Sequence, residues 1–218
     1  MKQRVTGLIV AAALLLARDA ASQSIEASAM TFTVQSQVRF AGTRVEQSGQ
    51  WMGGDGAIRL GFLRVGMFAA LGSLNGTADA LHPDSKGRVT SITVHMLPRS
   101  WMALGAVAEA KAFQTDVGTT VWRLLGANVR LTPALDTRTL EGLVDVSYWP
   151  SATVVGGEAM PLALRAVVGA TYRIAGGPLG IRLAYRFERF DFESRGSVPA
   201  RLEQFRGATL GALLRFGR

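Results

Sequence analysis

Apolar and polar residues alternate one by one over most of the chain after residue 30. Every second residue from Leu164 to Ile174 is apolar, and the residues from Ile181 to Phe187 alternate in the same way with charged neighbours. Successive side chains of a β-strand point to opposite faces, so this period of two predicts strands with one apolar and one polar face. The runs are about 10 to 15 residues long, whereas ordinary strands have roughly 5–6 and tilted membrane-crossing strands roughly 9–11.

The alternation predicts ten strands in an all-β, closed, antiparallel up-and-down transmembrane barrel. The strands are expected at residues 30–44, 50–62, 64–76, 88–97, 101–114, 118–131, 139–149, 162–175, 179–192 and 203–216. Short turns are expected near residue 63 and at 98–100, 132–138 and 176–178, longer loops at 77–87, 150–161 and 193–202, and shorter ones at 45–49 and 115–117. Short turns at one end and longer loops at the other are typical of bacterial outer-membrane barrels, whose strand number is even. Without the turn at Phe62–Arg64 the count would be nine, so eight strands are the alternative.

The two faces of the strands differ in a way that favours an apolar exterior. Long charged side chains of both signs lie at mid-strand, where they can pair across a narrow lumen. This predicted lumen network comprises Arg39, Arg59, Glu109, Lys111, Arg130, Glu141, Asp145, Arg165, Arg173, Arg182, Arg186, Glu188 and Arg215. The opposite faces, which include Phe32, Val34, Val144, Val168 and Leu183, are then expected to meet lipid.

Aromatic residues near the strand ends predict two girdles at the membrane interfaces, where amphipathic rings are enriched. One girdle would comprise Phe62, Tyr172 and Phe216, and the other Phe40, Trp122, Tyr148 and Phe187. The phase of Trp122 is ambiguous, because its neighbours Arg123 and Leu124 break the alternation.

The first residues have the composition of a secretory signal peptide. Lys2 and Arg4 precede a short apolar run, and Ala20–Ser22 supplies small residues before a cleavage site at Gln23. The run is shorter than the roughly 20 residues of a membrane-spanning helix, although an N-terminal anchor is the alternative. The predicted organisation is a cleaved signal peptide at 1–22, a lead-in at 23–29, a barrel at 30–216 and a C-terminal extension at 217–218.

Composition narrows the possible functions. The chain of 218 residues has a net charge of +8 but no Cys, which excludes disulfides and thiolate metal sites. Its Arg residues are scattered and form no helical basic stripe, so no nucleic acid partner is expected.

The last strand resembles that of the small outer-membrane β-barrel proteins of Gram-negative bacteria. Leu210, Ala212, Leu214 and Phe216 alternate toward a terminal aromatic residue, although Gly217 and Arg218 follow it. The resemblance implies that this strand is an assembly signal for the barrel-assembly machinery and that the protein resides in the outer membrane. It does not select a subfamily, because fold alone does not imply function.

Candidate chemistry is sparse. His95 and Ser91 are four residues apart on one strand face, and so are Glu141 and Asp145. Four residues of a strand span about 13 Å, which is too far for the two side chains to act as a catalytic pair. His82 falls in a predicted loop with Asp79 and Asp84. No catalytic residue, cofactor or metal is therefore expected.

The expected partners are outer-membrane lipids. Near loops and interfaces, five guanidinium groups could contact lipid phosphates. They belong to Arg88, Arg99, Arg195, Arg201 and Arg206.

These observations favour a structural or adhesive outer-membrane barrel, or one with a minor porin-like transport role, without catalysis. An excess of basic residues in the lumen leaves anion conduction open. A barrel enzyme acting on lipid or peptide would need His82 or His95 beside a hydroxyl or carboxylate near the outer rim. A soluble secreted carrier would instead turn Phe32, Val144, Val168 and Leu183 inward.

Overall fold

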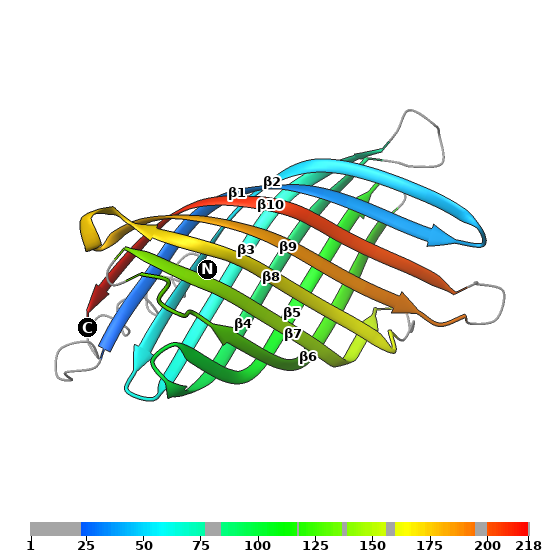
Figure 1. Ribbon diagram of the computed structural model, residues 1–218. Helices are drawn as coiled ribbons and strands as arrows, with labels where there is room; N and C mark the ends of the chain where they lie inside the picture. Colours follow the sequence, from blue (N-terminus) through cyan, green and yellow to red (C-terminus); the bar gives the residue numbers. More distant parts are fainter. Residues whose placement is uncertain are drawn as a thin grey trace, which may run out of the picture.

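A closed barrel of ten antiparallel strands forms the whole of the described chain (Figure 1). The computed structural model describes residues 23–76, 84–116, 118–136, 139–155, 160–194 and 200–217. Each strand pairs with its neighbours in sequence, and β1 closes the barrel by pairing with β10. The strands are β1 (Gln23–Phe40), β2 (Thr43–Leu60), β3 (Leu63–Gly76), β4 (Ser85–Arg99), β5 (Met102–Thr115), β6 (Gly118–Leu131), β7 (Leu140–Val154), β8 (Leu162–Arg173), β9 (Leu179–Phe192) and β10 (Arg201–Gly217). The predicted closed up-and-down fold of ten strands is confirmed.

The two ends of the barrel differ. The beginning of β1 and the end of β10 lie together at one end, which we call the terminal end (Figure 1). This end also holds the connections at 61–62, 100–101, 132–139 and 174–178, the last with the 3-10 turn η2 (Ile174–Gly176). The opposite end, the loop end, holds the connections at 41–42, 77–84, 116–117, 155–161 and 193–200. Within the described residues, no helix is long and apolar enough to cross a bilayer.

The first hairpin departs most from the predicted boundaries. Residues 23–29, expected as a lead-in, are the first part of β1 and pair with both β2 and β10. Two of their outward side chains, Ala27 and Ala29, are small, so the apolar alternation there is weak. The turn lies at Ala41–Gly42 rather than 45–49, and both residues have positive φ, as tight two-residue hairpin turns require.

The outer wall of the barrel is apolar. Large exposed side chains cover it from β3 to β10, including Leu71, Ile92, Leu125, Leu183 and Leu210. Val168 and Leu183 are both more than half exposed, at 56% and 62%. The outward apolar face predicted for β8 and β9 is therefore present.

A bulge in β7 sets which side chains enter the lumen near the loop end. The pairing with β6 shifts by one residue between Tyr148 and Ser151, next to Pro150, which cannot donate to the ladder. Opposite the bulge, Gly126 comes so close that an added Cβ would lie 2.0 Å from the carbonyl oxygen of Tyr148. The bulge places Ala152 inside the barrel and extends the strand beyond its predicted end at 149.

Candidate functional site

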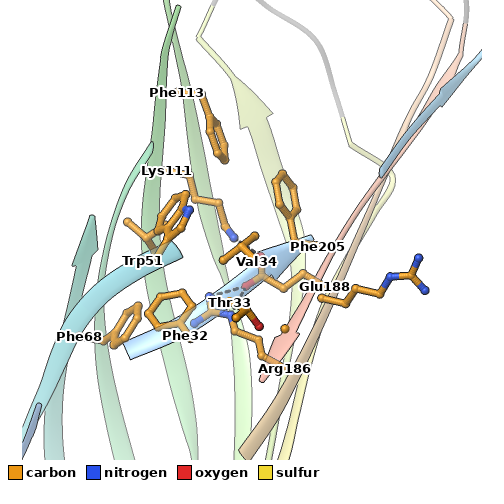
Figure 2. Close-up of a pocket in the computed structure, with 13 residues that line it drawn as sticks. Phe32, Thr33, Val34, Trp51, Phe68, Lys111, Phe113, Arg186, Glu188 and Phe205 are labelled. Carbon is orange, nitrogen blue, oxygen red and sulfur yellow. Dashed lines mark hydrogen bonds and ion pairs between the residues drawn. The ribbon is translucent and has the colours of Figure 1, made fainter. Parts of the chain in front are cut away.

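The lumen has three layers, and the one nearest the loop end is aromatic. We call it the aromatic layer, and it comprises Phe32, Trp51, Phe113, Trp122, Trp149, Phe190, Phe192 and Phe205. Figure 2 shows part of it, with Phe113 and Phe205 above Trp51 and Phe32. The ring centroids of Phe113 and Phe205 are 5.6 Å apart and stacked. Because β5 and β10 are on opposite walls, these rings meet across the bore.

Two residues of the aromatic layer contradict the sequence predictions. Trp122, expected in an outer girdle, is 2% exposed and lies inside, with its ring centroid 4.9 Å from that of Phe190. Phe32, expected to face lipid, is also buried inside, together with Val34. The loop-end half of the lumen is itself apolar, so there the polar side of a strand does not mark the interior.

The middle layer is a network of buried ion pairs across the lumen, which we call the ion-pair layer. Lys111 on β5 binds Glu188 on β9, and Arg165 on β8 binds Glu109 on β5. Lys111 Nζ also lies 3.4 Å from a carboxylate oxygen of Glu109, and Arg186 Nε donates to Glu188 over 2.8 Å. Buried charges are tolerated when they are paired in this way.

The aromatic and ion-pair layers are in direct contact. The ammonium of Lys111 lies 5.0 Å from the ring centroid of Phe190, and the guanidinium of Arg165 lies 5.2 Å from that of Trp149. A cation at these distances is attracted to the face of the ring. The rings therefore pack directly against the paired charges.

His95 belongs to a buried hydrogen-bond chain that joins the ion-pair layer through Ser147 and Arg165. Its Nε2 is 2.6 Å from Oδ1 of Asn128, whose Nδ2 donates to Asp145 Oδ1 at 2.8 Å and to Ser147 Oγ at 2.9 Å. Since the Asn128 oxygen can only accept, Nε2 carries the proton that is donated. His95 Nδ1 has no hydrogen-bond partner among the described residues. His82 lies outside the described residues.

The third layer, at the terminal end, consists of Arg side chains around a few carboxylates. Glu26 accepts from Arg215 at 2.9 Å and from Arg182 at 3.1 Å, and Arg130 lies at 3.6 Å. The guanidinium of Arg64 is 4.0 Å from the same carboxylate. One acidic side chain is therefore shared by four basic ones.

Two further carboxylates complete this layer. Glu141 binds Arg173 at 3.0 Å and Arg215 at 3.3 Å, while Asp55 lies 3.4 Å from Arg182 and accepts from Ser28. A cavity of about 310 Å³, which we call the vestibule, opens at this end. It is lined by Arg59, Arg64, Arg130, Arg173, Arg215 and Glu26, among others.

The structure brings together most of the predicted lumen network, with one exception. Arg39 is exposed at the end of β1, where its Nε donates to Gln37, so its assignment to the lumen is wrong. Arg39 lies on the same strand face as Thr31 and Thr33, and this face points outward because Phe32 and Val34 point inward. Arg59 lies at the vestibule and donates to the carbonyl oxygen of Gly61. The other predicted members take part in ion pairs inside the barrel.

Sequence reasoning missed three members of the network. Glu26 fell in the supposed lead-in, Asp55 in a glycine-rich run, and Arg64 beside a predicted turn. A period-two pattern extended backward from Phe32 would have placed Glu26 on the same face as Phe32. No pattern in the sequence indicates that these three residues meet.

The remaining predicted residues lie on the outer wall. Phe62, Tyr172 and Phe216 are exposed at the terminal end, whereas Phe40 is exposed at the tip of the first hairpin. Tyr148 is exposed on β7, and Phe187 is partly exposed on β9.

In β10, Leu210, Ala212, Leu214 and Phe216 form an outward row. Their contact with a membrane interface or with assembly machinery stays a prediction.

Comparison with solved structures places the chain among barrels of this kind. It is similar to the outer-membrane protease OmpT from Escherichia coli, with a TM-score of 0.53 and 8% identity over 89% of this chain and 97% of that one. At that identity the likeness shows a shared fold alone. No family model matches the chain, and no curated protein matches it.

Two other solved barrels match with lower scores. Neisserial surface protein A matches with a TM-score of 0.38 and 10% identity, over 87% of this chain and 97% of that one. Ail of Yersinia pestis, crystallised with a heparin analogue, matches with a TM-score of 0.35 and 12% identity, over 88% of this chain and 99% of that one. The likeness to OmpT alone shows the architectural resemblance to outer-membrane β-barrels of Gram-negative bacteria.

Proposed function

We propose that this protein is an outer-membrane barrel with a structural or adhesive role, whose lumen is closed and performs no catalysis. The observation that carries the proposal is the aromatic layer, because its rings from opposite walls touch across the bore. The cavity among Phe32, Trp51, Phe113 and Phe205 of that layer has a volume of only about 30 Å³. Wide aqueous channels require about 16–18 strands, whereas this barrel has ten.

The exterior supports placement in a membrane. Large apolar side chains cover the wall, and closure pairs the backbone of every strand, as a hydrocarbon environment demands. We infer that the chain is exported with cleavage after residue 22, which lies outside the described residues, and that lipid and the barrel-assembly machinery are its partners. Both termini would then face the periplasm, and the loop end the exterior.

A soluble carrier is less consistent with the exterior of this barrel. In such a protein Phe32, Val144, Val168 and Leu183 would point inward. Phe32 does so, but Val168 and Leu183 are exposed outside, and Val144 is the strand-pairing partner of Val168. Exposed apolar surface of this extent marks contact with a partner or a membrane.

A barrel enzyme also finds little support in the described residues. His95 contacts Asn128 and lies in the half of β4 nearer the terminal end, away from the outer rim. The hydroxyl of Ser147 already interacts with Asn128 and Arg165. A nucleophile and its base would need a direct hydrogen bond.

Planar-bilayer recordings test whether the lumen is closed. We expect no steady conductance steps from the purified protein, because the aromatic and ion-pair layers fill the bore. Flotation of the same proteoliposomes and the heat-dependent shift in gel mobility control for insertion and folding. Reproducible ohmic steps would contradict the closed lumen and favour the minor transport role.

Deletion of the gene in its host tests the role itself. A structural role predicts greater sensitivity to detergents, and an adhesive role predicts weaker attachment to surfaces. Unchanged behaviour in both assays would contradict the proposed function.

A further inference from the structure

We propose that the vestibule binds a phosphate-type oxyanion, either free or as part of a headgroup, which enters at the terminal end. The site lies apart from the aromatic layer and goes beyond the structural role. It rests on charge, on unsatisfied guanidinium groups and on the shape of the cavity.

The lining of the vestibule is strongly basic. Five Arg side chains line it against one carboxylate, Glu26. Glu141 pairs with Arg173 and Arg215, and Asp145 lies 3.9 Å from Arg130. Counting all three acids still leaves an excess of two positive charges. Attraction between charges is stronger in a partly dehydrated cavity than in bulk water, so this excess favours an anion.

Three of these guanidinium groups lack strong partners among the described residues. Arg59 contacts no carboxylate and donates only to the carbonyl oxygen of Gly61, at 3.2 Å. Arg64 approaches its nearest carboxylate oxygen only to 4.0 Å. Arg130 lies 3.6 Å from Glu26 and 3.9 Å from Asp145, beyond hydrogen-bonding distance in both cases. Their N–H groups are therefore available to a ligand.

The guanidinium fork matches the oxygen spacing of phosphate, which it binds through paired hydrogen bonds. The vestibule of about 310 Å³ has room for such a group. Arg64 and Arg130 also line a deeper cavity of about 120 Å³, which reaches Arg165 and Arg186 of the ion-pair layer. Arg64 and Arg130 can therefore be approached from both cavities.

A variant of Glu26 is expected to change the anion affinity in the direction opposite to that of the Arg variants. The Glu26 carboxylate occupies Arg182 and Arg215 and competes with any oxyanion for the shared guanidinium groups. Removing its charge in Glu26→Gln is expected to tighten anion binding severalfold. A network with a purely structural role would give no such gain.

The experiment is titration calorimetry of the full barrel in maltoside micelles, with inorganic pyrophosphate as the probe and a short-chain phosphatidylglycerol as a second probe. We expect saturable binding that Arg59→Gln and Arg64→Gln each weaken about tenfold or more, the scale of one lost charged hydrogen bond. Arg123→Gln, which alters an exposed Arg on the outer face of β6, is the matched control and should change nothing.

The outcomes separate the possible ligand sources. Binding of pyrophosphate with this Arg dependence supports a free anion, and the same dependence for the lipid alone supports a headgroup. Absence of binding for both probes, or equal weakening by Arg123→Gln, overturns the proposal. Arg59 forms no ion pair with the part of the chain that the structure describes, so its variant should fold, and the gel-mobility shift verifies this. The conductance result does not depend on any of these outcomes.

Discussion

Replacing Trp122 with alanine is expected to lower the free energy of unfolding by about 3–5 kcal/mol, the range for removal of a buried Trp or Phe side chain. The ring is 2% exposed and lies at the centre of the aromatic layer. Its centroid is 5.3 Å from that of Phe113, 4.9 Å from Phe190 and 5.5 Å from Phe192. The cavity left behind would separate rings that now meet across the bore.

Urea titration of the folded barrel in micelles, followed by the gel-mobility shift, measures this loss. Trp101→Ala is the matched control, because Trp101 is 46% exposed at the turn between β4 and β5. We expect that control to lose less than about 1 kcal/mol, as an exposed side chain would. Equal losses in both variants would show that Trp122 does not pack inside the barrel.

Replacing Lys111 with methionine is expected to cost about 3–5 kcal/mol of unfolding free energy, as when one partner of a buried ion pair is removed. The substitution leaves the carboxylates of Glu109 and Glu188 buried with one fewer cation between them. Arg165 and Arg186 still contact these carboxylates, which places the expected loss toward the lower end of that range.

A second substitution separates charge from packing at this position. Adding Glu188→Gln to Lys111→Met removes the carboxylate that has lost its Lys111 partner, so the double variant should recover part of the lost stability. Lys86→Met, at an exposed position on β4, should change stability by no more than about 0.5 kcal/mol. A double variant whose loss equals the sum of the single losses would mean that Lys111 and Glu188 are not energetically coupled.

Alternation along the chain was sufficient to predict the barrel and its ten strands. It worked best where one face is charged and the other aliphatic, as in β9, where Arg182 points inward and Leu183 outward. It failed for β1 and β6 near the loop end, because Phe32 and Trp122 enter an apolar lumen while polar or charged neighbours face out. Alternation identifies two faces, but it cannot identify the inner one when the lumen is also apolar.

The charged residues of the lumen were largely predictable, but their partners were not. Lys111 and Glu188 are 77 positions apart and meet only because β5 and β9 face each other across the closed barrel. That meeting depends on strand number, closure and register together, none of which is encoded locally. The same holds for the four Arg side chains that converge on Glu26.

The central claim is that aliphatic side chains on the outer wall contact lipid while the interior is filled with protein. The chain has no Cys, so Leu183→Cys and Leu213→Cys each provide a unique site for a spin label. Leu183 is 62% exposed on the wall, and Leu213 is 2% exposed inside. In lipid vesicles, the label at 183 should collide readily with molecular oxygen and rarely with a water-soluble nickel chelate, and the label at 213 should be immobilised. Frequent nickel collisions at 183 together with oxygen-rich, mobile behaviour at 213 would contradict the account.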